Sequence, residues 1–80
     1  MKNISVIGIG RLGLSFALSL EKNGYNVMGV DLHQDYVDDI NNLTFISPEP
    51  GISKLLKQAK NFTATTDLKR AFEHSDVLFC

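Results

Sequence analysis

Three glycines in the spacing Gly8-x-Gly10-x-x-Gly13 directly follow a short apolar run near the start of the chain. This run, residues 4–7, is rich in β-branched residues and has the length of a buried strand. The residues that follow have helical periodicity, so the glycines lie in a tight connection between a strand and a helix. A chain that begins in this way is strongly constrained toward an α/β fold.

The rest of the chain repeats this alternation. We predict strands at residues 4–7, 26–30, 62–65 and 77–80, and helices at 11–23, 35–40, 52–59 and between a cap at Thr66 or Asp67 and the turn at 75–76. Residues 41–51, which contain two prolines, form a loop. The pattern predicts an α/β fold with a Rossmann-type parallel sheet and helices on both faces. Its strand order is 3-2-1-4, and strands 5 and 6 of the doubly wound domain are missing.

The apolar positions of each predicted helix fall on one face, which we expect to pack against the sheet. Gly24 stands where a helix C-terminal glycine belongs. The carboxylates of Asp35, Asp38 and Asp39 are interpreted as a solvated outer face rather than a metal site. The expected inward residues are Leu12, Phe16, Ala17 and Leu20, then Val37 and Ile40, then Ile52, Leu55, Leu56 and Ala59, and last Leu68, Ala71 and Phe72.

The glycine turn has the surroundings of a dinucleotide-binding site, because it follows a strand, opens a helix and precedes a second strand that ends in an acidic residue. Gly8 permits the tight turn, Gly10 lets a pyrophosphate approach the backbone, and Gly13 lets the helix pack closely against the strand. The N–H groups of Arg11 and Leu12 have no helical partners. They would point at the phosphates, aided by the helix dipole.

The acidic residue at the end of the second strand is Asp31. Its carboxylate would accept hydrogen bonds from an adenosine ribose and repel a 2′-phosphate, which predicts NAD rather than NADP as the cofactor. The side chain of Arg11 is either a cation beside the pyrophosphate or a solvated residue at the helix start. His33 could line an adenine pocket, although we interpret it as an ordinary loop histidine.

The composition limits the classes of function. Eight basic and nine acidic residues give a net charge of −1, which leaves no basic surface for nucleic acid or an anionic membrane. The single cysteine, Cys80, is expected to be a small buried residue of the last strand. With no signal peptide expected, we predict a cytoplasmic location. No nucleophile–base pair or metal-ligand spacing is visible, so no catalytic residue is predicted.

Several segments together resemble the N-terminal domain of the UDP-glucose/GDP-mannose dehydrogenases, the NAD-dependent nucleotide-sugar 6-dehydrogenases. The opening from Ile4 to Leu14 and the segment Gly29-Val30-Asp31 follow the family pattern, but they occur in many dehydrogenases. More specific are the segments Glu49-Pro50-Gly51-Ile52, Ala64-Thr65-Thr66-Asp67 and Asp76-Val77-Leu78-Phe79. The resemblance extends over essentially all 80 residues.

The family oxidises the C6 alcohol of a UDP- or GDP-sugar to a carboxylate with two NAD molecules, through a cysteine-bound intermediate. The resemblance implies this activity for the parent protein, with NAD and a nucleotide sugar as partners. The family's nucleophilic cysteine, lysine and sugar-binding residues lie beyond residue 80, so Cys80 is not that cysteine. Residues 1–80 are expected to be the N-terminal part of an NAD-binding domain. The implied cofactor contacts are Gly8, Gly10, Arg11, Leu12 and Gly13 on the pyrophosphate and Asp31 on the ribose.

Three features depart from the family pattern. Five positions after the ribose aspartate the family usually has a basic residue, whereas this chain has Tyr36, which could stack on the cofactor or donate a hydrogen bond. Tyr36 therefore stays among the candidate cofactor-binding residues. Pro48 replaces a common tyrosine, and the threonine-proline segment that follows the fourth strand in the family is absent.

Two other interpretations stay open. The chain could belong to a dehydrogenase of the 6-phosphogluconate or 3-hydroxyacyl-CoA type, although the segments 49–51 and 64–67 argue against this. It could also be a non-catalytic nucleotide-sensing module, because fold alone does not decide function. In either case the outer edge of strand 77–80 is apolar and has no predicted neighbour, so we expect self-association through it.

Overall fold

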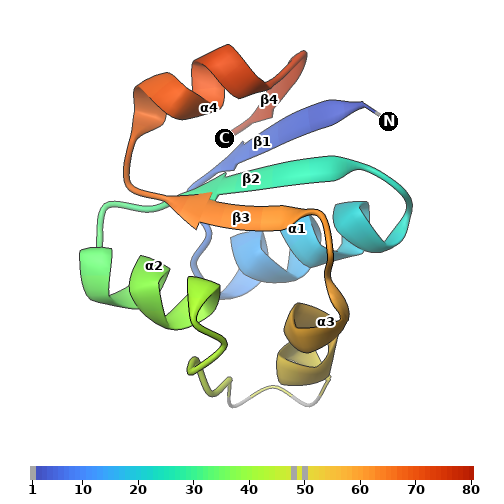
Figure 1. The fold of residues 1–80 in the computed structure, drawn as a ribbon, viewed down its shortest axis with the longest axis vertical. Helices are drawn as coiled ribbons and strands as arrows, with labels where there is room; N and C mark the ends of the chain where they lie inside the picture. The colour runs from blue at the N-terminus through green and yellow to red at the C-terminus, as the bar shows by residue number, and fades with distance from the viewer. Residues whose placement is uncertain (1, 48, 50) are drawn as a thin grey trace.

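The structure, a computed structural model, describes residues 2–47, 49 and 51–80. Within these residues one parallel sheet has the strand order β3-β2-β1-β4, as predicted (Figure 1). Its strands are β1 (Asn3–Ile7), β2 (Asn26–Val30), β3 (Phe62–Thr65) and β4 (Val77–Phe79). The helices are α1 (Arg11–Lys22), α2 (Gln34–Asn41), α3 (Ile52–Gln58) and α4 (Leu68–His74).

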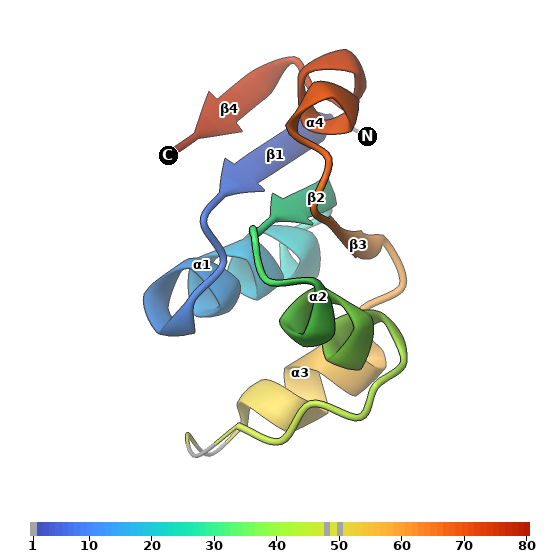
Figure 2. The same ribbon diagram turned by 90° about the vertical axis from the view of Figure 1, so that its left-hand side faces the viewer.

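Helices cover both faces of the sheet, which confirms the predicted layers. Figures 1 and 2 show α4 on one face and α1, α2 and α3 on the other. The alternation of side chains along β1 divides them between the two faces. Ile4 and Val6 join the larger core, which α1, α2 and α3 cover. Ser5 is fully buried on the opposite face, where its hydroxyl donates a hydrogen bond of 3.0 Å to the carbonyl of Ala71 in α4.

The face that α1 turns to the sheet differs from the predicted one. Leu12 is 82% exposed and Phe16 is 43% exposed, although both were expected to point inward. Leu20 is only partly buried, and of the predicted set Ala17 alone is fully covered. The buried residues of α1 are Leu14, Ala17 and Leu18.

The contact between Gly13 and Gly8 explains this rotation of α1. A Cβ atom on Gly13 would lie 2.1 Å from the carbonyl oxygen of Gly8, so the helix can approach the strand only along its glycine side. Ala17, one turn after Gly13, lies on that side, and Leu14 and Leu18 next to this row are carried into the core with it. The close approach at one glycine therefore sets which apolar residues of α1 are buried.

The predicted inner face of α4 is confirmed only at Ala71, and the predicted burial of Cys80 is wrong. Leu68 is 44% exposed and Phe72 is 57% exposed, and only Ala71 of this helix is buried. Because the small Ala71 meets Ser5 closely, the short helix leaves its larger apolar side chains outside the contact. Cys80 lies after the end of β4 and is exposed.

The ends of the helices follow the signals in the sequence. Gly24, with a φ of +98°, ends α1 in a Schellman motif, in which the N–H of Gly24 bonds to Glu21 and that of Tyr25 bonds to Leu20. Asp67 caps α4 by accepting hydrogen bonds from the backbone N–H groups of Lys69 and Arg70. Both predicted caps are confirmed.

The two helices between β2 and β3 also pack as predicted. Val37 and Ile40 of α2 and Ile52 and Leu56 of α3 are buried. The predicted loop 41–51 begins one residue later than expected, because Asn41 still belongs to α2. Pro48 and Pro50, on which part of the loop prediction and one departure from the family pattern depend, lie outside the described residues.

The two edges of the sheet differ. At the β3 edge, the side chain of Asn41 donates to the carbonyl of Ala64 and accepts from its N–H, each at 2.9 Å. This amide therefore bonds the two backbone groups of Ala64, which at an open strand edge could pair with another chain. At the other edge, β4 pairs with β1 (Figure 2), and none of the described residues pairs with its far side. No helix in the described part of the chain is long and apolar enough to cross a membrane.

Candidate functional site

The carboxyl ends of β1, β2 and β3 surround a hollow of about 370 Å³. It lies where ligands bind in open α/β sheets, outside the carboxyl ends of the strands and beside the point where the strand order reverses. Most of its lining is apolar, with one carboxylate and one imidazole among the side chains. The lining residues are Ile7 and Gly8 after β1, Val30, Asp31, Leu32 and His33 after β2, and Thr66 and Leu68 after β3.

The glycine turn forms one wall of this hollow and connects β1 to α1. Gly8 has a φ of +86°, a left-handed conformation that favours glycine, and its N–H donates to the carbonyl of Val30 at 2.7 Å. The first helical hydrogen bond of α1 runs from the N–H of Leu14 to the carbonyl of Gly10. The N–H groups of Arg11, Leu12 and Gly13 therefore lack helical acceptors, and α1 has no acidic residue in its first turn. The positive end of the helix is open to an anion.

Gly10 differs from the other two glycines of the turn. Its φ of −62° is accessible to any residue, and a Cβ atom there would meet nothing within 4 Å. The folded chain thus has no need of glycine at this position, whereas a pyrophosphate that lies against the turn would need one. The residues of the turn therefore fit a dinucleotide cofactor.

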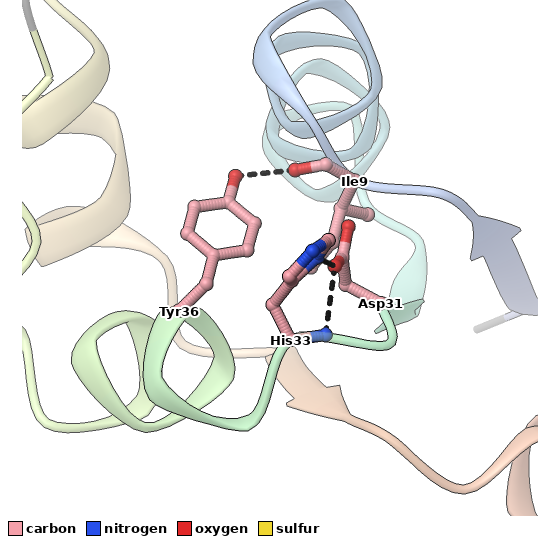
Figure 3. A network of polar contacts seen from close by, with 4 residues as sticks. All are labelled: Ile9, Asp31, His33 and Tyr36. Carbon is pink, nitrogen blue, oxygen red and sulfur yellow. Dashed lines mark hydrogen bonds and ion pairs between the residues drawn. The ribbon is translucent and has the colours of Figure 1, made fainter.

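Asp31 lies at the end of β2, with 15% of its side chain exposed (Figure 3). Its Oδ1 accepts hydrogen bonds from the backbone N–H of His33 at 3.1 Å and from Nδ1 of the same residue at 2.8 Å. Burial alone raises the pKa of the Asp31 carboxyl, but the His33 ring and the N–H groups of His33 and Ile9 together outweigh it and lower this pKa. The group is therefore a carboxylate at neutral pH. A carboxylate has about four acceptor positions, so it can still accept from ribose hydroxyls.

Tyr36 reaches back from α2 to the glycine turn, where its hydroxyl donates a hydrogen bond to the carbonyl of Ile9 (Figure 3). Its ring packs edge-on against Phe45, with the centroids 5.3 Å apart. Burial and the nearby charge of Asp31 raise the pKa of the Tyr36 phenol, which keeps the proton on the donor. The Tyr36 hydroxyl therefore donates its hydrogen bond to the protein and supports the turn that would hold a cofactor. Stacking of the ring on the cofactor, the other role considered for Tyr36, stays a prediction.

Ile9, the residue that Tyr36 holds, is fully buried. A Cβ atom on Gly29 in β2 would lie 2.8 Å from the side chain of Ile9, so this glycine makes room for it. The turn is therefore held in two ways. The side chain of Ile9 packs against β2, and the carbonyl of Ile9 accepts the hydrogen bond from Tyr36 in α2. Such anchoring keeps the N–H groups of the turn in place before a ligand arrives.

Arg11 lies at the start of α1 with 69% of its side chain exposed, and its Nε is 3.3 Å from a carboxylate oxygen of Glu49. An exposed pair of this kind contributes at most about 1 kcal/mol, so a phosphate could replace Glu49 at little loss. Arg11 also lines a second hollow of about 200 Å³, together with Gly10, Leu14, Tyr36, Phe45, Ser47 and Ile52. The geometry is compatible with its predicted contact to the pyrophosphate.

Of the predicted site residues, the structure brings Gly8 and Asp31 to one hollow and Gly10, Arg11 and Tyr36 to the next. Leu12 is 82% exposed, and its backbone N–H is one of the donors without a helical acceptor at the start of α1. His33, which was interpreted from the sequence as an ordinary loop histidine that could line an adenine pocket, lines the first hollow and contacts Asp31. The sequence spacing could have indicated this contact, because an aspartate side chain often accepts a hydrogen bond from the backbone N–H two residues later.

Other polar side chains near α2 serve the local structure. Asp38 accepts a hydrogen bond from Gln34 at 2.8 Å, and Asp39 accepts one from the hydroxyl of Thr44 at 2.9 Å. The part of the chain that the structure describes contains no group of three or more His, Cys, Asp or Glu residues that could hold a metal ion.

Comparison with known proteins gives a consistent match over this site. A sequence model described as UDP-glucose/GDP-mannose dehydrogenase family, NAD binding domain, matches residues 2–80. A UDP-N-acetyl-D-mannosamine dehydrogenase of Methanococcus maripaludis is 43% identical over 80 residues, which is 100% of this chain and 19% of that protein. A GDP-mannose 6-dehydrogenase of Pseudomonas aeruginosa is 38% identical over 79 residues, which is 95% of this chain and 18% of that protein.

The fold also matches a solved structure of a relative. A ternary complex of GDP-mannose dehydrogenase from Pseudomonas aeruginosa superimposes with a TM-score of 0.89 and 37% sequence identity, over 100% of this chain and 19% of that chain. The chain thus spans less than a fifth of the length of these relatives.

Proposed function

The chain belongs to the UDP-glucose/GDP-mannose dehydrogenase family and matches its NAD-binding domain, and from this premise we propose that Asp31 and the glycine turn hold the adenosine and pyrophosphate of NAD. Residues 1–80 would be the N-terminal part of such a domain. One observation carries the assignment. A carboxylate that stays charged at neutral pH stands at the end of β2 and lines the same hollow as Gly8.

Each element of the site has a task in this proposal. The ribose hydroxyls would donate to the carboxylate of Asp31, and the adenine would lie against the apolar side chains of Leu32 and Leu68. The pyrophosphate would lie over Gly10, where no Cβ atom obstructs it, and accept from the free N–H groups at the start of α1. Tyr36 would support the turn through Ile9. NAD, when bound, supplies the hydride acceptor, and the residues of this chain bind and orient its adenosine half.

We propose further that the whole protein oxidises the C6 alcohol of a UDP- or GDP-sugar to a carboxylate. The names of the relatives favour this class of substrate over a 6-phosphogluconate or a 3-hydroxyacyl-CoA. They also favour it over a sensing module without activity. We place the protein in the cytoplasm, which the single cysteine favours, because a reducing compartment keeps thiols free.

The test of this proposal is turnover by the intact protein. It should reduce NAD in the presence of UDP-glucose, UDP-N-acetylmannosamine or GDP-mannose, with two NADH formed per sugar, measured by NADH absorbance and by mass analysis of the sugar product. A sugar nucleotide that lacks the C6 alcohol, such as the corresponding uronate, serves as the control and should give no NADH. If no UDP- or GDP-sugar gave NADH, this result would contradict the proposed activity.

The open edge of β4 leads to a separate prediction for the 80-residue chain on its own. Leu78 and Phe79 are each 39% exposed there, and Phe79 packs against Phe16 of α1 with ring centroids 5.1 Å apart. An unprotected apolar strand edge pairs with other chains. We expect concentration-dependent self-association in sedimentation velocity, and Leu78→Lys should shift the chain toward monomer, since a charge protects an edge. A wild-type chain that stays monomeric at high concentration would refute this prediction.

A further inference from the structure

His33 stands directly beside the carboxylate assigned to the ribose. Its Nδ1 is 2.8 Å from Oδ1 of Asp31, which requires Nδ1 to carry the proton, while 84% of its side chain is exposed (Figure 3). His33 also lines the hollow that Asp31 lines. His33 therefore contacts the carboxylate that we propose to select NAD over NADP, and it is accessible to protons from the solvent.

One carboxylate contacts this imidazole directly, that of Asp31. β1 contributes Ile7 and Gly8 to the hollow, and the segment after β3 contributes Thr66 and Leu68, none of which is titratable. The other charged or titratable residues at the adjoining helix starts are Asp35 and Tyr36 in α2, and Asp67, Lys69 and Arg70 at the start of α4. Among the described residues, the ion-pair contact of this imidazole is with Asp31.

We propose that His33 determines how strongly the site rejects NADP, and that its protonation relaxes this rejection. The proposal rests on the proposed function, in which Asp31 binds the adenosine ribose. While His33 is neutral, the charge of Asp31 faces a 2′-phosphate without compensation. An imidazolium at 2.8 Å offsets that charge.

Protonation also changes the hydrogen-bonding groups at the site. Neutral His33 donates from Nδ1 to Asp31 and has an acceptor at Nε2, which cannot bond a phosphate oxygen favourably. The imidazolium keeps the first bond and gains a charged donor at Nε2. A phosphate on the ribose then meets a donor and a cation in place of an acceptor, whereas the hydroxyls of NAD gain little from the change.

The test measures the affinity of the intact protein for NAD and NADP at about pH 8 and about pH 5.5, on either side of the range in which histidine side chains ordinarily titrate. His33→Gln is the matched variant, because its amide can still donate to Asp31 but does not titrate. The preference for NAD should fall about three- to fivefold more in the wild type than in H33Q on acidification. Protonation of the 2′-phosphate affects both proteins equally and cancels in this comparison.

A second variant, His33→Lys, places a permanent cation near Asp31 and should weaken the preference for NAD already at about pH 8. Equal pH dependence in the wild type and H33Q, with NAD binding intact, would overturn the role of His33. If neither protein binds NAD at about pH 8, the proposed function fails, and this inference fails with it.

Discussion

Replacing Asp31 with alanine should lower the affinity of the intact protein for NAD by about 10- to 100-fold, the loss expected when a charged acceptor is removed from buried hydroxyl donors. The same change should remove most of the preference for NAD over NADP, because the charge that faces the 2′-phosphate is gone. Asp31 lines the hollow at the end of β2 and keeps its carboxylate ionised at neutral pH. Calorimetric titration with each cofactor measures both effects.

Asp35→Ala is the matched control for this prediction. It removes the same charge from the first turn of α2, a few residues along, on the exposed outer face of the helix. We expect its affinities to stay within about twofold of the wild type, since exposed surface changes away from a site have small effects. An Asp31→Ala protein with unchanged selectivity between NAD and NADP would show that the ribose binds elsewhere.

The parts of the site that the sequence predicted are those that depend on neighbouring residues along the chain. The spacing from Gly8 to Gly13 defines a strand-to-helix turn by itself, and Asp31 is placed by the end of the strand that precedes it. The strand order follows from the alternation of strands and helices together with the handedness of crossovers. None of these features needs a distant side chain to be known in advance.

The rotation of α1 could not be predicted in the same way. Apolar residues occur at every second position from Leu12 to Leu20, so several faces of the helix satisfy the periodicity equally well. The choice among them is made by the approach of Gly13 to Gly8 across the turn, a contact between backbones that periodicity does not report. The apolar faces of short helices such as α4 are ambiguous for the same reason.

The hydrogen-bond partners of polar side chains also could not be predicted from the sequence. Tyr36 was predicted as a candidate cofactor contact, and the sequence did not indicate that its hydroxyl donates to Ile9, a residue 27 positions earlier. His33 was treated as a loop residue, yet it forms a hydrogen bond with Asp31. Residue type says which bonds a side chain can form, but only the packing of α2 against the turn decides which one it does form.

Alanine substitutions at two glycines of the turn should separate stability from cofactor binding. At Gly13, the new Cβ atom would lie 2.1 Å from the backbone oxygen of Gly8, and neither partner is a flexible side chain that could move aside. We expect Gly13→Ala to destabilise the fold by about 3 kcal/mol or more, near or beyond the upper end for overpacking. Urea denaturation measures this loss, which is a large part of the stability of a domain of this size.

Gly10→Ala should have the opposite profile. The φ of Gly10 suits alanine and its Cβ atom would meet nothing in the protein, so the urea midpoint should stay the same or rise slightly. The added methyl group would occupy the space of the pyrophosphate, and NAD affinity should fall at least about tenfold, equivalent to about 1.4 kcal/mol. If Gly10→Ala binds NAD as tightly as the wild type, the cofactor does not lie over the turn. If Gly10→Ala is destabilised as strongly as Gly13→Ala, Gly10 serves the fold rather than the cofactor.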